Sequence, residues 1–319
     1  MSGRGDRGVT GLLGGLAIGM ATGLLAACLT WPTPAPKTAG VTQTVTVRSV
    51  AGLEARLQDN GFTLAAVRRG EAPVPRLFLR HLPADWRSIE DPRKRKRRFI
   101  AAILPLILAV NEDIATDRRR LLTLADKAPQ SRSDVDRAWL NKLARRYGTS
   151  TDALPMLKRR VNVVPPSLAL AQAAVESGWG TSRFAMQGNA LFGQRIWRVD
   201  AGMTPLDVDA DTAFRVRSFP SLAASVAAYA HNLNTHRAYG EFRGLRATAG
   251  KDGRTPGGNV LATALTRYSE RGADYVADLL RVIRGNRLTQ FDGAALAPAD
   301  AGARISARDN VKITVKQGT

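Results

Sequence analysis

The spacing of apolar residues changes along this chain and divides it into segments. From about residue 92 to about residue 284, apolar positions recur every three or four residues in several stretches, the spacing of amphipathic helices. Between residues 191 and 217 that spacing is lost, and Val, Ile, Phe and Trp alternate with Gly, Pro and several Asp residues. This mixture favours a small β-hairpin lobe. The pattern therefore predicts a mainly α (α+β) domain with a small β-lobe.

Capping residues mark where the expected helices begin and end. A long helix is predicted over about residues 92–125, and Pro105 should kink or break it because proline lacks a backbone N–H. Ser133, three residues before Asp136, resembles a capping box and predicts a helix that Gly148 terminates. Further helices should begin at Pro165-Pro166-Ser167 and at Pro220-Ser221, and a last one should span about Gly272 to Arg284.

The N-terminal pattern predicts a membrane tether. Arg4 and Arg7 precede a segment without charges, whose apolar part spans residues 9–27 and is typical of a signal peptide or a membrane anchor. It ends in Leu25-Ala26-Ala27-Cys28, which resembles a bacterial lipobox, so we favour a lipidated Cys28 over an uncleaved transmembrane segment. Both alternatives hold the chain at a membrane with its body exported. Cys28 is the sole cysteine, which rules out an intramolecular disulfide.

The rest of the chain divides by composition. A Pro-rich stretch should form a semi-rigid linker, and the segment after it has short strand-like runs near residues 41–47 and 62–67 with a helical run between them. The last residues are rich in Ala, Asp and Arg, which predicts a mobile tail. The expected organisation is a signal or anchor segment (1–28), the linker (29–40), a small module (41–75), the main domain (76–290) and the tail (291–319).

The chain is strongly basic, with a net charge of +20 over 319 residues. Such a surface suits any polyanion, whether nucleic acid, anionic lipid or teichoic acid. The densest run of charge is Arg93-Lys94-Arg95-Lys96-Arg97-Arg98. No aromatic or base-reading motif accompanies it and the N-terminus predicts export, so we interpret it as a solvated helix start and expect no nucleic-acid partner.

One acidic residue stands at the end of an otherwise apolar helical segment. Glu176 lies within residues 171–182 and is followed at once by Ser-Gly-Trp-Gly. Apolar neighbours raise the pKa of a carboxyl group, so Glu176 can hold a proton near neutral pH, as the acid of a glycosidase must. The alternative is a solvated Glu near a helix end, with Gly178 only terminating the helix.

A family resemblance favours the catalytic interpretation. Residues 176–182 and 188–194 resemble the bacterial β-N-acetylglucosaminidase family, lysozyme-like enzymes that cut peptidoglycan. Residues 214–216, 232–239 and 268–275 resemble its Bax-like branch. The resemblance implies a lysozyme-like helical domain whose β-lobe forms a cleft, hydrolysis of β-1,4 bonds in peptidoglycan glycan strands, and no cofactor. The rival hypothesis is a non-catalytic wall-binding or scaffold protein of the same fold, and a less favoured one is a basic protein that binds nucleic acid or an anionic surface.

Glycoside hydrolysis usually needs a second carboxylate. The resemblance places it on the β-lobe, where Asp200, Asp207, Asp209 and Asp211 are available. We expect Asp209 or Asp211 to serve, although many relatives have a Glu and this lobe contains none. Without such a residue, the 2-acetamido carbonyl of the substrate can act as an internal nucleophile.

Five other residues are candidates beside Glu176. Tyr268 and Tyr275 match paired tyrosines of the family and are expected to bond the acetamide or the attacking water, unless they only pack a helix. Trp179 and Phe192 stack on sugar faces or fill the core, and we favour support of the turn for Trp179 and packing for Phe192. Asn189 binds substrate or backbone, or tolerates a left-handed conformation.

A metal site is not expected. His231 and His236 are five residues apart, about 140° around a helix, and so do not share a face. Cysteine ligands for a structural zinc are also missing.

Overall fold

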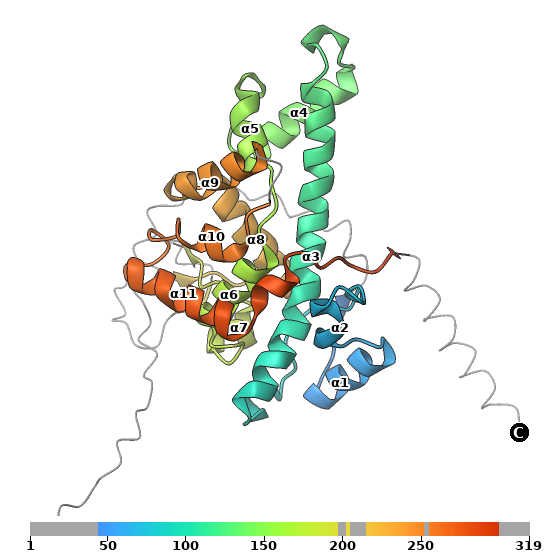
Figure 1. The fold of residues 1–319 in the computed structure, drawn as a ribbon, viewed down its shortest axis with the longest axis vertical. Helices are drawn as coiled ribbons and strands as arrows, with labels where there is room; N and C mark the ends of the chain where they lie inside the picture. Colours follow the sequence, from blue (N-terminus) through green and yellow to red (C-terminus); the bar gives the residue numbers. More distant parts are fainter. Residues whose placement is uncertain (1–43, 197–201, 205–214, 252–254, 300–319) are drawn as a thin grey trace, which may run out of the picture.

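The computed structural model describes residues 44–196, 202–204, 215–251 and 255–299, and its helices surround one long central helix (Figure 1). The predicted signal segment and linker, with Cys28, lie outside the described residues. The described chain is mainly helical with two short sheets, as the apolar pattern predicted.

The central helix is α3 (Pro92–Ala125), which runs unbroken through Pro105. Asp91 begins it by accepting a hydrogen bond from the amide of Arg93. Every residue from Phe99 to Val110 is buried, and a helix that is apolar all round is held by its neighbours rather than by one face. We attribute the survival of the helix at Pro105 to this packing, which offsets the hydrogen bond that proline cannot donate.

Length and apolarity alone would let α3 cross a membrane. Among the described residues it is the one helix that meets this test, and 72% of its apolar window is buried inside the protein. In this structure α3 is therefore the core helix of a globular body.

Helix α6 (Pro166–Ser177) lies against α3 and begins at the predicted Pro-Pro-Ser sequence. Its first turn is tied down by Asp292, which accepts hydrogen bonds from the amide and the hydroxyl of Ser167, both at 2.8 Å. Ser221 caps α8 (Leu222–Thr235), confirming that start as well. The helices packed against α6 besides α3 are α10 (Gly258–Ala262) and α11 (Ala273–Gly285).

The outer helices follow the predicted caps. Ser133 Oγ accepts from the amide of Asp136 at 3.2 Å, which confirms the cap of the helix predicted there. Leu140, Leu143 and Tyr147 bury one face of that helix. This helix is α4 (Asp134–Arg146), and other outer helices are α5 (Leu154–Arg160), α7 (Arg183–Gly188) and α9 (Gly240–Lys251).

Two pairs of strands complete the fold. β3 (Arg195–Ile196) pairs antiparallel with β4 (Arg215–Val216), which agrees with a small β-lobe after Leu191. β1 (Thr44–Val45) pairs in parallel with β2 (Phe78–Leu79).

The N-terminal region differs from the sequence-based expectation. The predicted strand over residues 62–67 is wrong, because residues 64–68 form the helix α2 (Leu64–Arg68), capped by Thr63. Helix α1 (Val50–Asp59) precedes it. Leu53 of α1 and Val67 of α2 are buried in the same apolar core as α3 and α6. From the sequence alone this short segment fits a strand or a helix, because its conformation depends on packing against the core.

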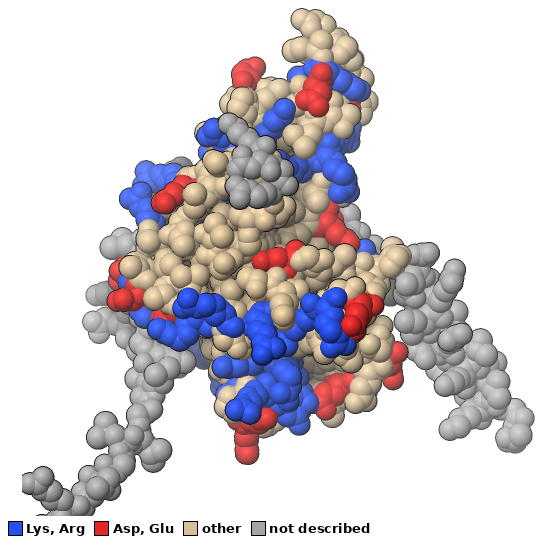
Figure 2. All heavy atoms as spheres, viewed as in Figure 1, with Lys and Arg blue, Asp and Glu red and all other residues tan. Residues whose placement is uncertain are grey.

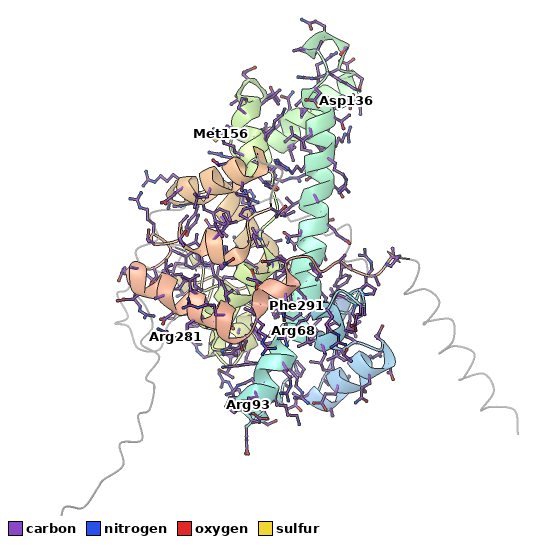
Figure 3. The ribbon with its side chains drawn as sticks, in the orientation of Figure 1. Arg68, Arg93, Asp136, Met156, Arg281 and Phe291 are labelled. Carbon is purple, nitrogen blue, oxygen red and sulfur yellow. The ribbon has the colours of Figure 1, made fainter. Side chains whose placement is uncertain are left out.

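The chain also stays in the body beyond Phe291, where the mobile tail was expected to begin. Leu288 and Phe291 of the final turn η5 (Leu288–Phe291) are buried, and Arg68 lies 5.0 Å over the ring of Phe291 (Figure 3). Further on, Leu296 forms a parallel bridge with Val74. Residues 292–299 are therefore part of the fold.

Guanidinium groups of buried and half-buried arginines lie at the C-terminal ends of several helices. The last carbonyls of a helix lack partners within it and carry partial negative charge, so a guanidinium both bonds and neutralises them. Arg246 is 4% exposed and bonds the carbonyl of Arg159 in the last turn of α5 and those of Asn162 and Val163 just after it. Burial lowers the pKa of Arg246 to about 9, which leaves it charged at neutral pH. Arg118, Arg160 and Arg243 do the same at the ends of α5, α4 and α8.

We predict that Arg246→Met lowers the free energy of unfolding by about 3 kcal/mol, because the part-buried carbonyls of Arg159 and Val163 and the buried Oδ1 of Asn234 lose a donor. Urea denaturation of both proteins measures this directly. Arg119→Met, at an exposed position of α3, removes the same charge and should change stability by less than about 0.5 kcal/mol. Equal losses in the two variants would contradict the capping role.

Candidate active site

Glu176 stands in the last turn of α6, with its two carboxylate oxygens in different surroundings. Oε1 accepts a hydrogen bond from the hydroxyl of Tyr275 on α11 at 2.8 Å. Oε2 faces Gly193, where an added Cβ would lie 3.5 Å away. Gly193 has a φ of +57°, a conformation that glycine adopts without strain. One oxygen is therefore held by protein, and the other faces backbone at the start of the β-lobe.

The environment of Glu176 suits an acid catalyst. Burial raises the pKa of Glu176 to about 7, and the Tyr275 hydrogen bond and the positive charge of Arg195 oppose this only in part. Such a group carries a proton in a large fraction of molecules at neutral pH and can also exist as the anion. This is the property that the apolar segment before Glu176 predicted.

A chain of hydrogen bonds fixes the direction of the Tyr275 hydroxyl. Tyr229 on α8 donates to Gln172 Oε1 at 2.6 Å, and Gln172 Nε2 donates to the Tyr275 oxygen at 3.0 Å. Because that oxygen already accepts from Gln172, its own proton points to Glu176. Gln172 is fully buried, so water does not compete for these bonds.

Aromatic rings support this chain from behind. The rings of Tyr268 and Tyr275 are stacked with centroids 5.4 Å apart, and those of Phe192 and Tyr229 with centroids 3.9 Å apart. Phe192 is buried, so its ring packs in the core and is not free to stack on a sugar. The Tyr268 hydroxyl donates to the carbonyl of Phe192 at 3.4 Å and not to Glu176. Burial raises the pKa of Tyr268 and Tyr275 well above the usual range, which keeps both as neutral donors.

The turn after Glu176 has an unusual backbone. Gly178, Trp179 and Gly180 all have positive φ, and Trp179 at 58° is a bulky residue in a conformation that costs on the order of 1–3 kcal/mol. Trp86 Nε1 compensates by donating to the Trp179 carbonyl at 2.9 Å. A Cβ on Gly180 would come within 2.8 Å of Trp86 Nε1, so only glycine fits there. Trp179 thus belongs to the support of the turn.

Asn189 is used by the fold. It ends α7 with a left-handed φ of 52°, and its side chain donates to the carbonyl of Phe219 at 2.9 Å. Its Oδ1 lies 3.1 Å from His81 Nδ1. Asn189 therefore both bonds the backbone and adopts a left-handed conformation, and its side-chain amide is engaged within the protein.

The candidates for the second carboxylate, Asp209 and Asp211, lie outside the described residues. Within the described part, Glu270 and Glu176 are the two carboxylates whose charges act on Arg195 of β3. Arg195, Glu270 and Gln172 were not predicted from the sequence. For Gln172 a signal existed, since a polar residue four positions before Glu176 shares its helical face.

The described ranges contain no group of three His, Cys, Asp or Glu side chains that could hold a metal ion. His231 and His236 serve separate roles. The His231 ring lies 5.6 Å from that of Tyr147, and His236 Nδ1 accepts from the amide of Ala238.

Comparison with known proteins relates the site to a family. Residues 153–288 match the family model named Glucosaminidase, described as mannosyl-glycoprotein endo-beta-N-acetylglucosaminidase. The chain is 32% identical over 210 residues to protein bax of Escherichia coli (strain K12), across 64% of this chain and 74% of the relative. The catalytic domain of the autolysin Auto of Listeria monocytogenes matches 55% of this chain and 97% of its own length, at 20% identity and a TM-score of 0.28. A TM-score that low gives no information about the arrangement of the helices.

We predict that the raised pKa of Glu176 makes stability depend on pH. The folded protein binds this proton more tightly than the unfolded chain, whose pKa is 4.5, so stability falls as pH rises from about 4.5 to about 7. Wild type should lose about 2 kcal/mol more between pH 5 and pH 8 than Glu176→Gln, which has no proton to lose. Urea denaturation at both pH values checks this. The control is Glu241→Gln, at an exposed position of α9. Parallel losses in all three proteins would refute the raised pKa.

Proposed function

Because the chain belongs to the bacterial Bax-like glucosaminidase family, we propose that it is a glycoside hydrolase that cuts β-1,4 bonds next to N-acetylglucosamine in peptidoglycan. The observation that carries this proposal is the half-buried Glu176 carboxyl, whose pKa its surroundings raise to about 7, so that it can act as the general acid.

The proposed acid step uses the two oxygens of Glu176 differently. The Tyr275 hydroxyl donates a hydrogen bond to Oε1, so the acidic proton of Glu176 occupies Oε2, which faces Gly193. As the glycosidic C–O bond breaks, that proton passes to the leaving oxygen and Glu176 becomes an anion. The Tyr275 hydrogen bond and the charge of Arg195 favour this anion, so they stabilise Glu176 as it loses its proton.

The second half of the reaction has two candidate routes. In the first, Asp209 or Asp211 on the β-lobe activates water or attacks the sugar. In the second, the substrate's own acetamido carbonyl attacks, and a carboxylate is not required. Tyr275 is proposed as the residue that positions Glu176, with Tyr268 as packing support.

We place the protein in the cell envelope, on the periplasmic side, bound to peptidoglycan glycan strands. The tether is a lipidated Cys28 or an N-terminal transmembrane segment. Export brings the enzyme to its polymeric substrate, and the tether keeps it at the membrane. No cofactor is part of the proposed reaction.

The first test is cleavage of purified peptidoglycan by the full chain in mild detergent, with released ends identified by mass spectrometry. We predict new reducing N-acetylglucosamine ends from wild type, and a rate lower by about 10²–10⁴-fold for Glu176→Gln, because it cannot donate a proton. Glu241→Gln should cleave like wild type. Reducing N-acetylmuramic ends would instead identify a muramidase.

A folded wild type that binds peptidoglycan and releases nothing would favour the rival proposal, a non-catalytic wall-binding protein. Unchanged cleavage by Glu176→Gln would remove Glu176 as the acid.

A pair of tyrosine variants tests the positioning role. Activity that needs a protonated acid falls as pH rises through the pKa of Glu176. Tyr275→Phe removes a hydrogen bond that lowers this pKa, so the alkaline limb of the pH–rate profile should move to higher pH. Tyr268→Phe removes a hydroxyl of the same kind that does not bond Glu176, and should leave the limb in place. The hypothesis fails if the two variants shift the limb alike.

A further inference from the structure

The basic run at the start of α3 lies beside the turn that follows Glu176. Lys96 Nζ is 5.2 Å from the centre of the Trp179 ring. Shortly before α3, Arg87 Nε donates to the carbonyl of Thr181 at 2.8 Å. Both contacts reach residues of the catalytic turn, which is more than a solvated helix start requires.

The run divides between the fold and the surface. Arg95 bonds the carbonyl of Ile89, and Arg98 forms an ion pair with Glu54 of α1, so these two hold structure together. Arg93 and Arg97 are exposed, and Arg93 precedes Lys96 by three residues and so shares its helical face. We call Arg93, Lys96 and Arg97 the cationic edge.

The cationic edge lies where Lys and Arg gather at the start of α3, as Figure 2 shows. Asp91 is an acidic residue beside it, and a hydrogen bond from the Arg93 amide lowers the pKa of Asp91, helped by the charges of Arg97 and Arg93. Figure 3 places Arg93 there, toward the same end of the molecule as Arg281. A concentration of one sign of charge attracts anionic partners from solution and is weakened by salt.

We propose that the cationic edge binds carboxylate groups of an acidic glycan strand while Glu176 cuts it, which makes the protein prefer acidic strands over neutral ones. This inference rests on the proposed function for the identity of the strand. Because the edge and the acid are joined through Trp179 and α6, a strand lying on one is brought to the other. An anionic membrane surface is the competing occupant, but it would need no contact between the edge and the catalytic turn.

Binding can be tested apart from cleavage in a Glu176→Gln background. The full chain is sedimented with native peptidoglycan and with peptidoglycan whose carboxylates are converted to neutral amides by carbodiimide and ethanolamine. We expect about tenfold tighter binding to the native polymer, falling as salt is raised. Adding Arg93→Gln, Lys96→Gln and Arg97→Gln should reduce the preference to less than about twofold.

The matched control combines Arg119→Gln, Lys142→Gln and Arg145→Gln, which removes the same charge from exposed positions of α3 and α4. Arg119 is 26 residues along α3 from Arg93, about 39 Å at 1.5 Å per residue. This control should keep the preference. An equal loss in both variants would overturn the proposal in favour of net charge alone.

Binding to vesicles with and without phosphatidylglycerol tests the competing occupant, an anionic membrane surface. If the edge variant loses vesicle binding and keeps its preference for native peptidoglycan, the edge is a membrane surface and the proposal fails. Binding that depends on the edge, in a wild type that cleaves nothing, would instead overturn the proposed hydrolysis and leave the edge standing. Equal cleavage of native and amidated peptidoglycan would overturn the role of the cationic edge and leave the proposed hydrolysis standing.

Discussion

The structure depends on keeping one ionisable carboxyl group inside a packed helical body. Burial alone would hold Glu176 in its neutral form, and a fixed hydrogen bond from Tyr275 partly offsets that cost. A general acid needs both states to be accessible, so the hydrogen bond must offset part of the effect of burial but not all of it. Gln172 and Tyr229 set the direction of the hydrogen bond, so the balance depends on helices α6, α8 and α11 holding a common arrangement.

The surrounding fold supplies that arrangement at both ends of α6. Asp292 fixes its first turn from a segment more than a hundred residues away, and Trp86 fixes the strained turn after Glu176. The core helix α3 lies along its side. Buried and half-buried arginines at the ends of α4, α5 and α8 satisfy carbonyls that would otherwise be buried without partners. Part of the large positive charge is therefore structural, and only part of it is available on the surface.

Much of the helical architecture could be read from local signals. The starts of α4, α6 and α8 are encoded by a serine cap or by proline at the first turn, which act over three or four residues. The failures occurred where packing outweighs local preference. Pro105 does not break α3 because that helix is buried all round, and the segment at 64–68 is helical although its residues also suit a strand. Phe291 and Leu296 stay in the body because each finds a distant partner.

For the site, the sequence by itself determined which residue is proposed as the acid. A single Glu in an apolar helix before a glycine-rich turn fixes both its burial and its position, because these depend on neighbours a few residues away. Tertiary structure alone decided which groups complete it. Tyr229 lies 57 positions from its partner Gln172, and Tyr275 lies 99 positions from Glu176. Tyr268 and Tyr275 cannot be told apart in the sequence, because only the structure shows that the Tyr275 hydroxyl reaches the carboxylate. Hydrogen bonds act only at contact, and contacts between distant segments are set by how the helices pack.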